Sequence, residues 1–139
     1  MKKTIKIILL LVLTFSVSMK EIFASEKIKI GLLVPLTGKN SEIGHSIIKS
    51  TRLAVNKIDD LSIEIIPRDT QSNPQGTLNA AKELGNLGVK IIIGPVFNEN
   101  LIYLDDLTEI TFLSLTNKNN NFSKNIINAG INAVSQLNA

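Results

Sequence analysis

Short apolar runs rich in isoleucine and valine alternate along this chain with segments whose apolar residues recur every three or four positions. The first pattern is typical of buried strands and the second of amphipathic helices. Several of the runs stop at proline or glycine, as strands do where they enter a turn. The predicted strands are residues 28–34, 61–66, 89–93 and 110–114, and the predicted helices are residues 41–59, 73–88 and 98–109.

Strands that alternate with helices are joined by right-handed crossovers, and such crossovers build a parallel sheet covered on both faces. The sequence therefore predicts the α/β class, with an open doubly wound parallel sheet. A short fifth strand over residues 125–129 and a helix from Ile131 follow the four main strands. Because that helix is cut off after nine residues, we expect the fold to be incomplete at the C-terminus.

The predicted helix ends carry recognisable signals. Ser41 can cap the first helix, and Asn73 followed by Pro74 predicts the start of the second. Gly88 predicts where the second helix ends, because glycine adopts the left-handed backbone that commonly terminates helices.

The first 24 residues resemble a secretory signal peptide. Lysines at the start precede the apolar run of residues 7–17, and Ala24 is a small residue suited to cleavage. A membrane anchor is the alternative, but the apolar run is shorter than the roughly 20 residues that span a bilayer. We expect export, cleavage after Ala24 and a periplasmic mature chain of residues 25–139.

Cleavage of this segment would change the net charge of the protein. The 139 residues include 15 Lys and Arg and 12 Asp and Glu, a net charge of +3. Residues 25–139 contain 11 of each and carry no net charge. A neutral domain has no basic footprint for nucleic acid. The absence of cysteine excludes a disulfide, a thiolate metal site and a lipidated cysteine within this sequence.

Signatures of enzymes are missing from the sequence. It contains no dinucleotide-binding glycine motif, no phosphate-binding loop and no nucleophile elbow. His45 is the only histidine, so a multi-histidine metal site is excluded, and we expect it at the surface. The pairs Asp59–Asp60 and Asp105–Asp106 would point about 100° apart on a helix, which does not suit two carboxylates that share a substrate. We expect neither catalysis nor a metal or cofactor.

Ligands of open parallel sheets bind at the carboxyl ends of the strands. The loops at residues 36–40, 96–100 and 115–117 would lie there, with hydroxyl and amide groups available for hydrogen bonds. The alternative is that these polar residues form only turns and caps. Asp69, just beyond the second strand, is expected to bond backbone N–H groups rather than a ligand.

Four segments of the chain resemble type I periplasmic solute-binding proteins of the leucine/isoleucine/valine-binding type, in the order in which that family has them. They are residues 29–38 (KIGLLVPLTG), residues 53–56 (LAVN), residues 68–81, which begin RDT and include Pro74 and two alanines, and residues 88–95 (GVKIIIGP). The same pattern occurs in periplasmic activators of penicillin-binding proteins, which share the fold.

The resemblance implies that residues 25–139 are part of an N-terminal lobe. Such a lobe holds one side of a small solute, here an amino acid or a similar polar molecule, for delivery to the membrane subunits of an ABC importer. It also implies that the loops after Gly94-Pro95 and after the fourth strand bind the carboxylate and ammonium groups. The candidate ligand-binding residues are Thr37, Phe97, Asn98, Ser114, Leu115 and Thr116.

Two features depart from the family pattern. Phe97, Asn98 and Glu99 stand where small hydroxyl residues are common, and a carboxylate facing the cleft would repel an anionic ligand group. The family also has two lobes, whereas this sequence stops within the first, so we expect weak ligand binding from it alone.

Two functions remain open from the sequence. The first is the solute-binding component of an ABC importer. The alternative is an activator of a penicillin-binding protein, a protein–protein module on the same fold. The lack of cysteine argues against the lipid anchor often present in the second group.

Overall fold

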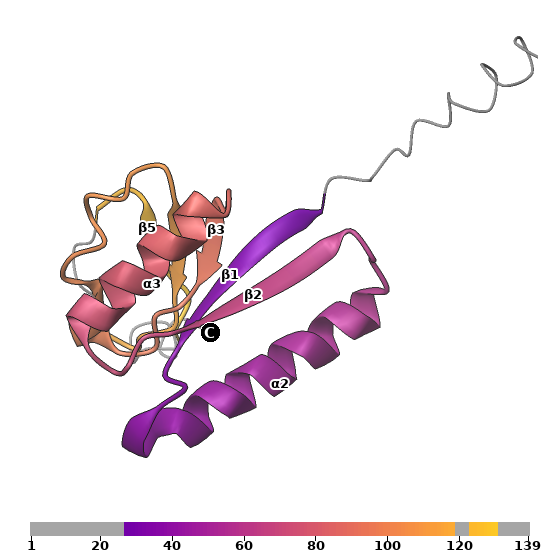
Figure 1. Ribbon diagram of the computed structural model, residues 1–139, viewed down its shortest axis with the longest axis horizontal. Coiled ribbons are helices and arrows are strands. Elements are labelled where there is room, and N and C mark those ends of the chain that lie inside the picture. Colours follow the sequence, from indigo (N-terminus) through magenta and orange to yellow (C-terminus); the bar gives the residue numbers. More distant parts are fainter. Residues whose placement is uncertain (1–26, 119–122, 131–139) are drawn as a thin grey trace, which may run out of the picture.

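The computed structural model of the chain describes residues 27–118 and 123–130, which build a five-stranded parallel sheet (Figure 1). The strands are β1 (Ile28–Val34), β2 (Ile63–Asp69), β3 (Ile91–Ile93), β4 (Thr111–Ser114) and β5 (Ile126–Asn128). Their order is β2-β1-β3-β4-β5, and every neighbouring pair is parallel. The predicted open, doubly wound parallel sheet is confirmed.

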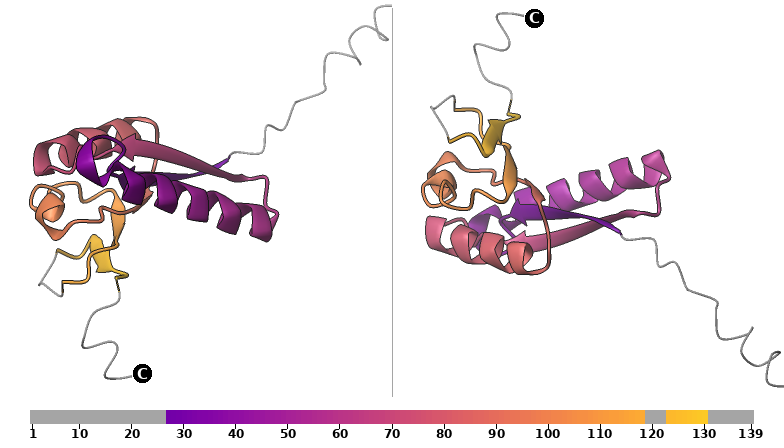
Figure 2. Two further views of the ribbon diagram at one scale, coloured as in Figure 1. Left: turned by 90° about the horizontal axis from the view of Figure 1, so that it is seen from below. Right: turned by 90° about the horizontal axis from the view of Figure 1, so that it is seen from above.

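Two α-helices lie on opposite faces of this sheet (Figure 2). Helix α2 (Ser41–Ile58) connects β1 to β2, and helix α3 (Pro74–Asn86) connects β2 to β3. Two short 3-10 helices, η1 (Gly38–Asn40) and η2 (Asn98–Leu101), follow β1 and β3. Among the described residues, no helix is long and apolar enough to cross a membrane.

The hydrophobic core lies on the face that α3 covers. Leu33, Ile92 and Phe112 project from neighbouring strands onto Leu84 of α3, and all four are fully buried. Burying a side chain of this size stabilises a fold by about 1.5–3 kcal/mol. The predicted strands supply this core because alternate residues of a strand point to the same face.

Strand β2 does not stop at Pro67 as predicted from the sequence. It continues to Asp69, and Pro67 pairs with Leu32 of β1. Proline has no N–H to donate to a neighbouring strand, so it is tolerated where that group would face away from the sheet. The position of β2 at the end of the strand order supplies such an edge.

The predicted helix over residues 98–109 is wrong. Only η2 forms there, and turns follow it, closed by hydrogen bonds from Leu104 N to Leu101 O, from Leu107 N to Leu104 O and from Ile110 N to Leu107 O, 3.0 to 3.1 Å long. Each bond joins residues three apart, as in a 3-10 helix. The apolar residues that pack into the core here are also three apart, and that spacing matches three residues per turn better than the 3.6 of an α-helix. They are Leu101, Leu104, Leu107 and Ile110.

The other helix ends follow the sequence closely. Asn73 Oδ1 accepts a hydrogen bond of 2.7 Å from Gly76 N, and Pro74 is the first residue of α3. Gly88, just after α3, has a φ of 82°, as expected for a residue that ends a helix. The predicted cap by Ser41 is not made, because the capping position is Asn40 and its side chain makes no capping hydrogen bond.

Strands β3 and β4 begin slightly later than predicted, and β5 falls within its predicted range. The predicted signal peptide and the predicted helix from Ile131 lie outside the described residues.

Candidate functional site

The carboxyl ends of β1, β3 and β4 meet at one edge of the sheet, where the candidate loops begin. Leu115 N donates to Pro95 O at 3.0 Å, and Gly94 N donates to Leu113 O at 2.8 Å, so the loops after β3 and β4 are held together. Ala129 N donates to Ser114 O at 2.8 Å and joins the end of β5 to the same edge. We call this region the carboxyl edge.

Asp69 holds the loop after β1 in place. Its Oδ1 accepts hydrogen bonds of 2.8 Å from the backbone N–H groups of Leu36 and Gln71, and its Oδ2 accepts one of 2.7 Å from the Thr37 hydroxyl. The predicted backbone-binding role of Asp69 is confirmed. Burial alone would raise the pKa of this carboxyl, but the hydrogen bonds outweigh it, so the pKa lies below its usual value.

The hydroxyls of Ser114 and Thr116 are also engaged within the protein. Ser114 Oγ accepts a hydrogen bond of 3.3 Å from Thr116 N, and Thr116 Oγ1 accepts one of 3.3 Å from Lys118 N. Both residues are buried, with 0% and 3% of their surface exposed. These bonds are the local turns that serine and threonine form with the backbone two residues further on.

The six predicted ligand-binding residues do not line one common cavity. Thr37 is exposed beside Asp69, and Ser114 and Thr116 are buried. Phe97, Asn98 and Leu115 are half-buried at the surface of the edge. Leu115 lines a groove against α2, whereas Asn98 lines a different groove against the start of α3.

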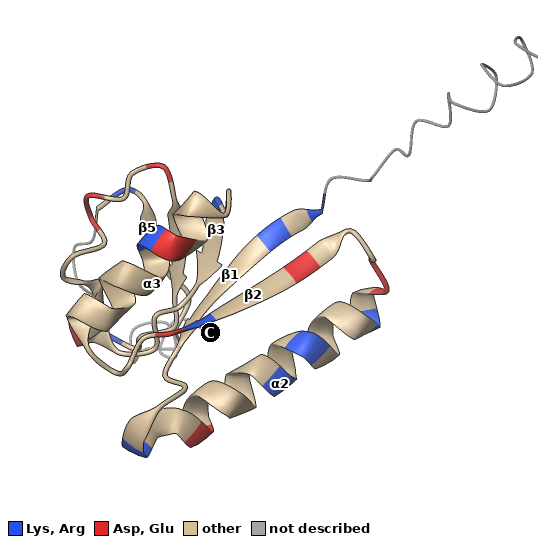
Figure 3. Ribbon diagram, viewed as in Figure 1, with Lys and Arg blue, Asp and Glu red and all other residues tan. Residues whose placement is uncertain are grey.

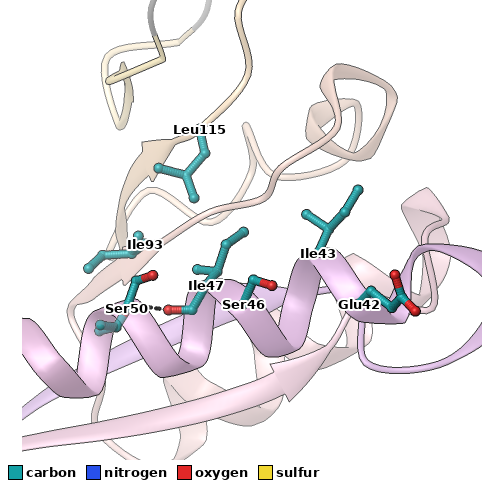
Figure 4. A pocket seen from close by; sticks show the side chains of 8 residues that line it. Glu42, Ile43, Ser46, Ile47, Ser50, Ile93 and Leu115 are labelled. Carbon is teal, nitrogen blue, oxygen red and sulfur yellow. Dashed lines mark hydrogen bonds between the residues drawn. The ribbon is translucent and has the colours of Figure 1, made fainter.

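The groove against α2 has a volume of about 570 Å³. Figure 4 shows Ile43 and Ile47 projecting from α2 toward Ile93 of β3 and toward Leu115, which follows β4, with Glu42 at one end. Four of the eight residues that line the groove are apolar, and the polar ones are Glu42, Ser46, Ser50 and Thr51. The helical spacing of Ile43 and Ile47 predicts the helix but does not reveal whether anything covers their side chains.

Asn100 in η2 is a further residue whose environment could not be predicted from the sequence. It is 1% exposed, and neither its amide nitrogen nor its amide oxygen has a hydrogen-bond partner in the described part of the chain. Burying an unpaired amide destabilises a fold, so this position is costly to maintain. The sequence offers no signal for it, since asparagine is common in turns.

The acidic and histidine side chains give no sign of a reactive site. His45, Asp59 and Asp60 are exposed, as the sequence predicts. Across residues 27–118 and 123–130, no group of three or more His, Cys, Asp and Glu side chains is placed to hold a metal ion.

Solved structures of two kinds resemble this fold. One is the leucine-binding protein LivK of Thermotoga maritima, with 21% identity, a TM-score of 0.59 and coverage of 66% of this chain and 28% of that one. Another is the solute-binding protein of an ABC transporter from Rhodopseudomonas palustris, in complex with 3,4-dihydroxybenzoic acid, with 26% identity, a TM-score of 0.60 and coverage of 66% and 28%.

The second kind is represented by the C-domain of LpoA from Haemophilus influenzae, a regulator of PBP1A. It has 23% identity, a TM-score of 0.61 and coverage of 74% of this chain and 32% of that one. The chain thus spans less than a third of the length of each of these relatives. No curated protein matches the sequence.

The family comparison agrees with the fold. Residues 27–132 match the family described as periplasmic binding protein. The match begins at the residue before β1 and extends beyond β5, so it includes every strand of the sheet. The chain belongs to the periplasmic binding protein family.

Proposed function

We propose that this chain serves as a binding lobe in the cell envelope, where the carboxyl edge and the adjoining α2 groove contact a protein partner. The partner class is a synthase of cell-wall polymer, that is, a penicillin-binding protein. The observation that carries the proposal is that the polar groups of the edge are already bonded to one another, whereas its apolar side chains are partly exposed.

An amino acid carries a carboxylate and an ammonium, and each must find partners when it leaves water. The hydroxyls of Thr37, Ser114 and Thr116 already bond within the protein, as does Leu115 N. These hydroxyls keep spare bonding capacity, because a hydroxyl can both donate and accept. Ser114 and Thr116 are only 0% and 3% exposed, however, so a polar ligand would reach them only if the edge rearranged. The apolar surface of Phe97, Leu115 and the α2 isoleucines is suited to a protein interface instead, where aromatic and aliphatic side chains form the buried centre.

The relatives include proteins of both kinds. LpoA, the regulator of PBP1A, covers 74% of this chain, against 66% for the leucine-binding protein. Both groups share the fold, so the comparison alone does not separate the two functions. A role in binding rather than catalysis is common to both.

The test is binding of the purified chain to the penicillin-binding proteins of the same bacterium, immobilised one at a time. Ile43→Asp places a charge in the groove at a residue 43% exposed, and we expect it to weaken binding at least about tenfold. Leu61→Asp is the matched control, because Leu61 is 90% exposed beyond the far end of α2. Equal binding by both variants, or no binding to any synthase, would refute the proposal.

The second candidate is the solute-binding component of an ABC importer, with the importer's membrane subunits as partners. The α2 groove favours it, because about 570 Å³ is within the range of small-ligand pockets. Its lining would suit a molecule with an apolar body, such as a branched-chain amino acid. A thermal-shift screen with leucine, isoleucine, valine and aromatic acids tests it, with Ile47→Ser as the variant that should abolish any shift.

Both functions require export to the periplasm. We propose that residues 1–24 are a signal peptide cleaved after Ala24. Mass spectrometry of the exported protein should find Ser25 as the first residue, and an intact Met1 would refute this.

A further inference from the structure

A second groove lies on the face of the sheet opposite α2, between the start of α3 and the residues from η2 onward. Its volume is about 470 Å³. Pro74 of α3 forms one wall, and Leu101, Ile102 and Tyr103 contribute apolar surface to the other. We call it the α3 groove.

Two side chains of this groove expose apolar surface to solvent. Ile102 is 66% exposed and Tyr103 is 48% exposed, and they are adjacent in the sequence. The turns that replace the predicted helix direct Leu101 and Leu104 inward and leave these two outside. Tyrosine is one of the residue types enriched at the energetically dominant positions of protein interfaces.

The rim of the α3 groove is acidic. Glu99 and Asp105 line it, and neither forms an ion pair with another residue of the described ranges. Asp105 Oδ1 accepts a hydrogen bond of 2.9 Å from the Ser123 hydroxyl. Residues 91–117 also include Asp106 and Glu109 but no lysine or arginine. Figure 3 shows acidic residues along this part of the chain, whereas lysine and arginine predominate on α2.

We propose that the α3 groove binds a basic segment of the protein partner, one in which lysine or arginine alternates with an apolar residue. This rests on the proposed function, since it specifies a second contact with the same partner. The carboxylates attract the cationic groups, and the ring of Tyr103 can pack against a lysine stem or a guanidinium. The apolar residues of the segment cover Ile102 and Pro74.

The chain contains its own reporter for this groove. Tyr103 is the only tyrosine, and there is no tryptophan, so the intrinsic fluorescence of the protein comes almost entirely from one wall of the groove. The probe is a short synthetic peptide of alternating lysine and leucine. We expect it to change the Tyr103 emission in a saturable way, and increasing salt should weaken the effect.

Two matched peptides separate charge from apolar contact. A glutamate–leucine peptide should leave the emission unchanged, and a lysine–serine peptide should bind at least about tenfold more weakly than the lysine–leucine peptide. Equal binding by the lysine–leucine and glutamate–leucine peptides would overturn the proposal. So would equal binding by the lysine–serine peptide, because the apolar wall would then contribute nothing.

Variants locate the contact. Ile102→Ser and the double change Glu99→Gln with Asp105→Asn should each weaken lysine–leucine peptide binding about tenfold. These residues are at the surface, and circular dichroism checks that each variant remains folded. The control is Asp59→Asn, which removes an exposed carboxylate just after the end of α2, outside both grooves. If the control weakens binding as much as the double change does, the peptide is not held by this groove and the proposal fails.

The outcomes distinguish this inference from the function on which it rests. If Ile43→Asp abolishes synthase binding while the peptide leaves Tyr103 emission unchanged, the α3 groove proposal alone is wrong. If the peptide binds at Tyr103 but no synthase binds, the proposed partner is wrong. A further outcome is that the α3 groove binds helix α2 of a second copy of this chain, because α2 carries basic residues like those of the probe. Analytical ultracentrifugation would then show dimers that the lysine–leucine peptide dissociates. That result would identify a second copy as the occupant of the groove and overturn the proposal.

Discussion

The two faces of the sheet differ in how completely they are covered. On the α3 face, Ile92 and Phe112 are fully buried against the helix and the turns after β3. On the α2 face, the helix lies over β1 and β2, while Ile91 is 43% exposed and Ile127 is 51% exposed on the strands beyond it. A parallel sheet is usually buried on both faces. The closed face therefore holds the fold together, and the open face retains apolar surface for contacts with other molecules.

Strand β3 shows this difference within three identical residues. Ile91 is 43% exposed, Ile92 is fully buried and Ile93 is half-buried, because successive side chains point to opposite faces. Composition alone therefore gives no indication of which isoleucine stabilises the fold. Because Ile91 and Ile92 are the same residue type in the same strand, replacing each by alanine compares the contributions of the two faces to stability.

The largest effect is expected from Ile92→Ala. It removes buried methyl and methylene groups from the closed face and leaves a cavity, which costs about 2–5 kcal/mol of unfolding free energy. Chemical denaturation followed by circular dichroism measures the loss. A change of less than 1 kcal/mol would mean that the α3 face is not the main core.

Gly44→Ala is expected to loosen the attachment of α2. A β-carbon at this position would lie 1.7 Å from Pro35 O, so the first turn of the helix must move away from the loop after β1. Overpacking of this kind costs about 1–3 kcal/mol. Ser46→Ala, an exposed site on the same helix, is the control in the same denaturation measurement. Equal stability of the two variants would show that α2 is not held by this contact.

Asn100→Leu is expected to stabilise the closed face by about 1 kcal/mol, because it removes a buried amide without partners. Asn100→Asp should do the opposite, since it places a carboxylate in the same buried position. Thermal unfolding of both variants beside the parent measures the two shifts. A loss of stability in the leucine variant would show that the amide has a partner in solution.

Lowering the pH tests how much the hydrogen bonds of Asp69 at the carboxyl edge stabilise the fold. Its pKa is lowered in the folded protein, so its stabilising contribution is present above the unfolded pKa and is lost as the pH falls through the folded pKa. Unfolding free energy should therefore fall as the pH drops below about 4. Asp69→Asn should flatten this part of the profile, measured by denaturation at a series of pH values. Identical acid profiles would mean that other carboxyls control the acid response.

The smallest effect is expected from Ile91→Ala, the open-face counterpart of Ile92→Ala. Because Ile91 already contacts solvent, we expect a loss of less than about 1 kcal/mol. The same denaturation series measures it. A loss as large as that of Ile92→Ala would show that the open face is covered in solution.

The sequence predicted the strands well because isoleucine-rich runs that stop at turns are a strong local signal. It failed over residues 98–109, where the spacing of Leu101, Leu104 and Leu107 was interpreted with the wrong period. It also placed the end of β2 too early, because the tolerance of a strand for Pro67 depends on the order of strands in the sheet. That order is a property of the whole fold and cannot be deduced from the local pattern.

The place of the candidate loops in the fold could be predicted from the sequence, but the bonding of their side chains could not. The rule that ligands bind at the carboxyl ends of parallel strands selected loops that the structure brings to one edge of the sheet, and ligand binding there stays a prediction. Whether their hydroxyls are free depends on distant partners, as with Thr37 and Asp69, which are 32 residues apart in sequence. The role of Ile47 in a groove likewise depends on which surface faces it.

Pro67 has a consequence for how this protein behaves at high concentration. An exposed strand edge is a template on which other chains can add strands and begin to aggregate. At the β2 end of the sheet, the missing N–H of Pro67 interrupts that template. β5, at the other end of the described sheet, contains no proline. Strand addition should thus be less favourable at the β2 edge than at the β5 edge, so any aggregation of the sheet would start from β5.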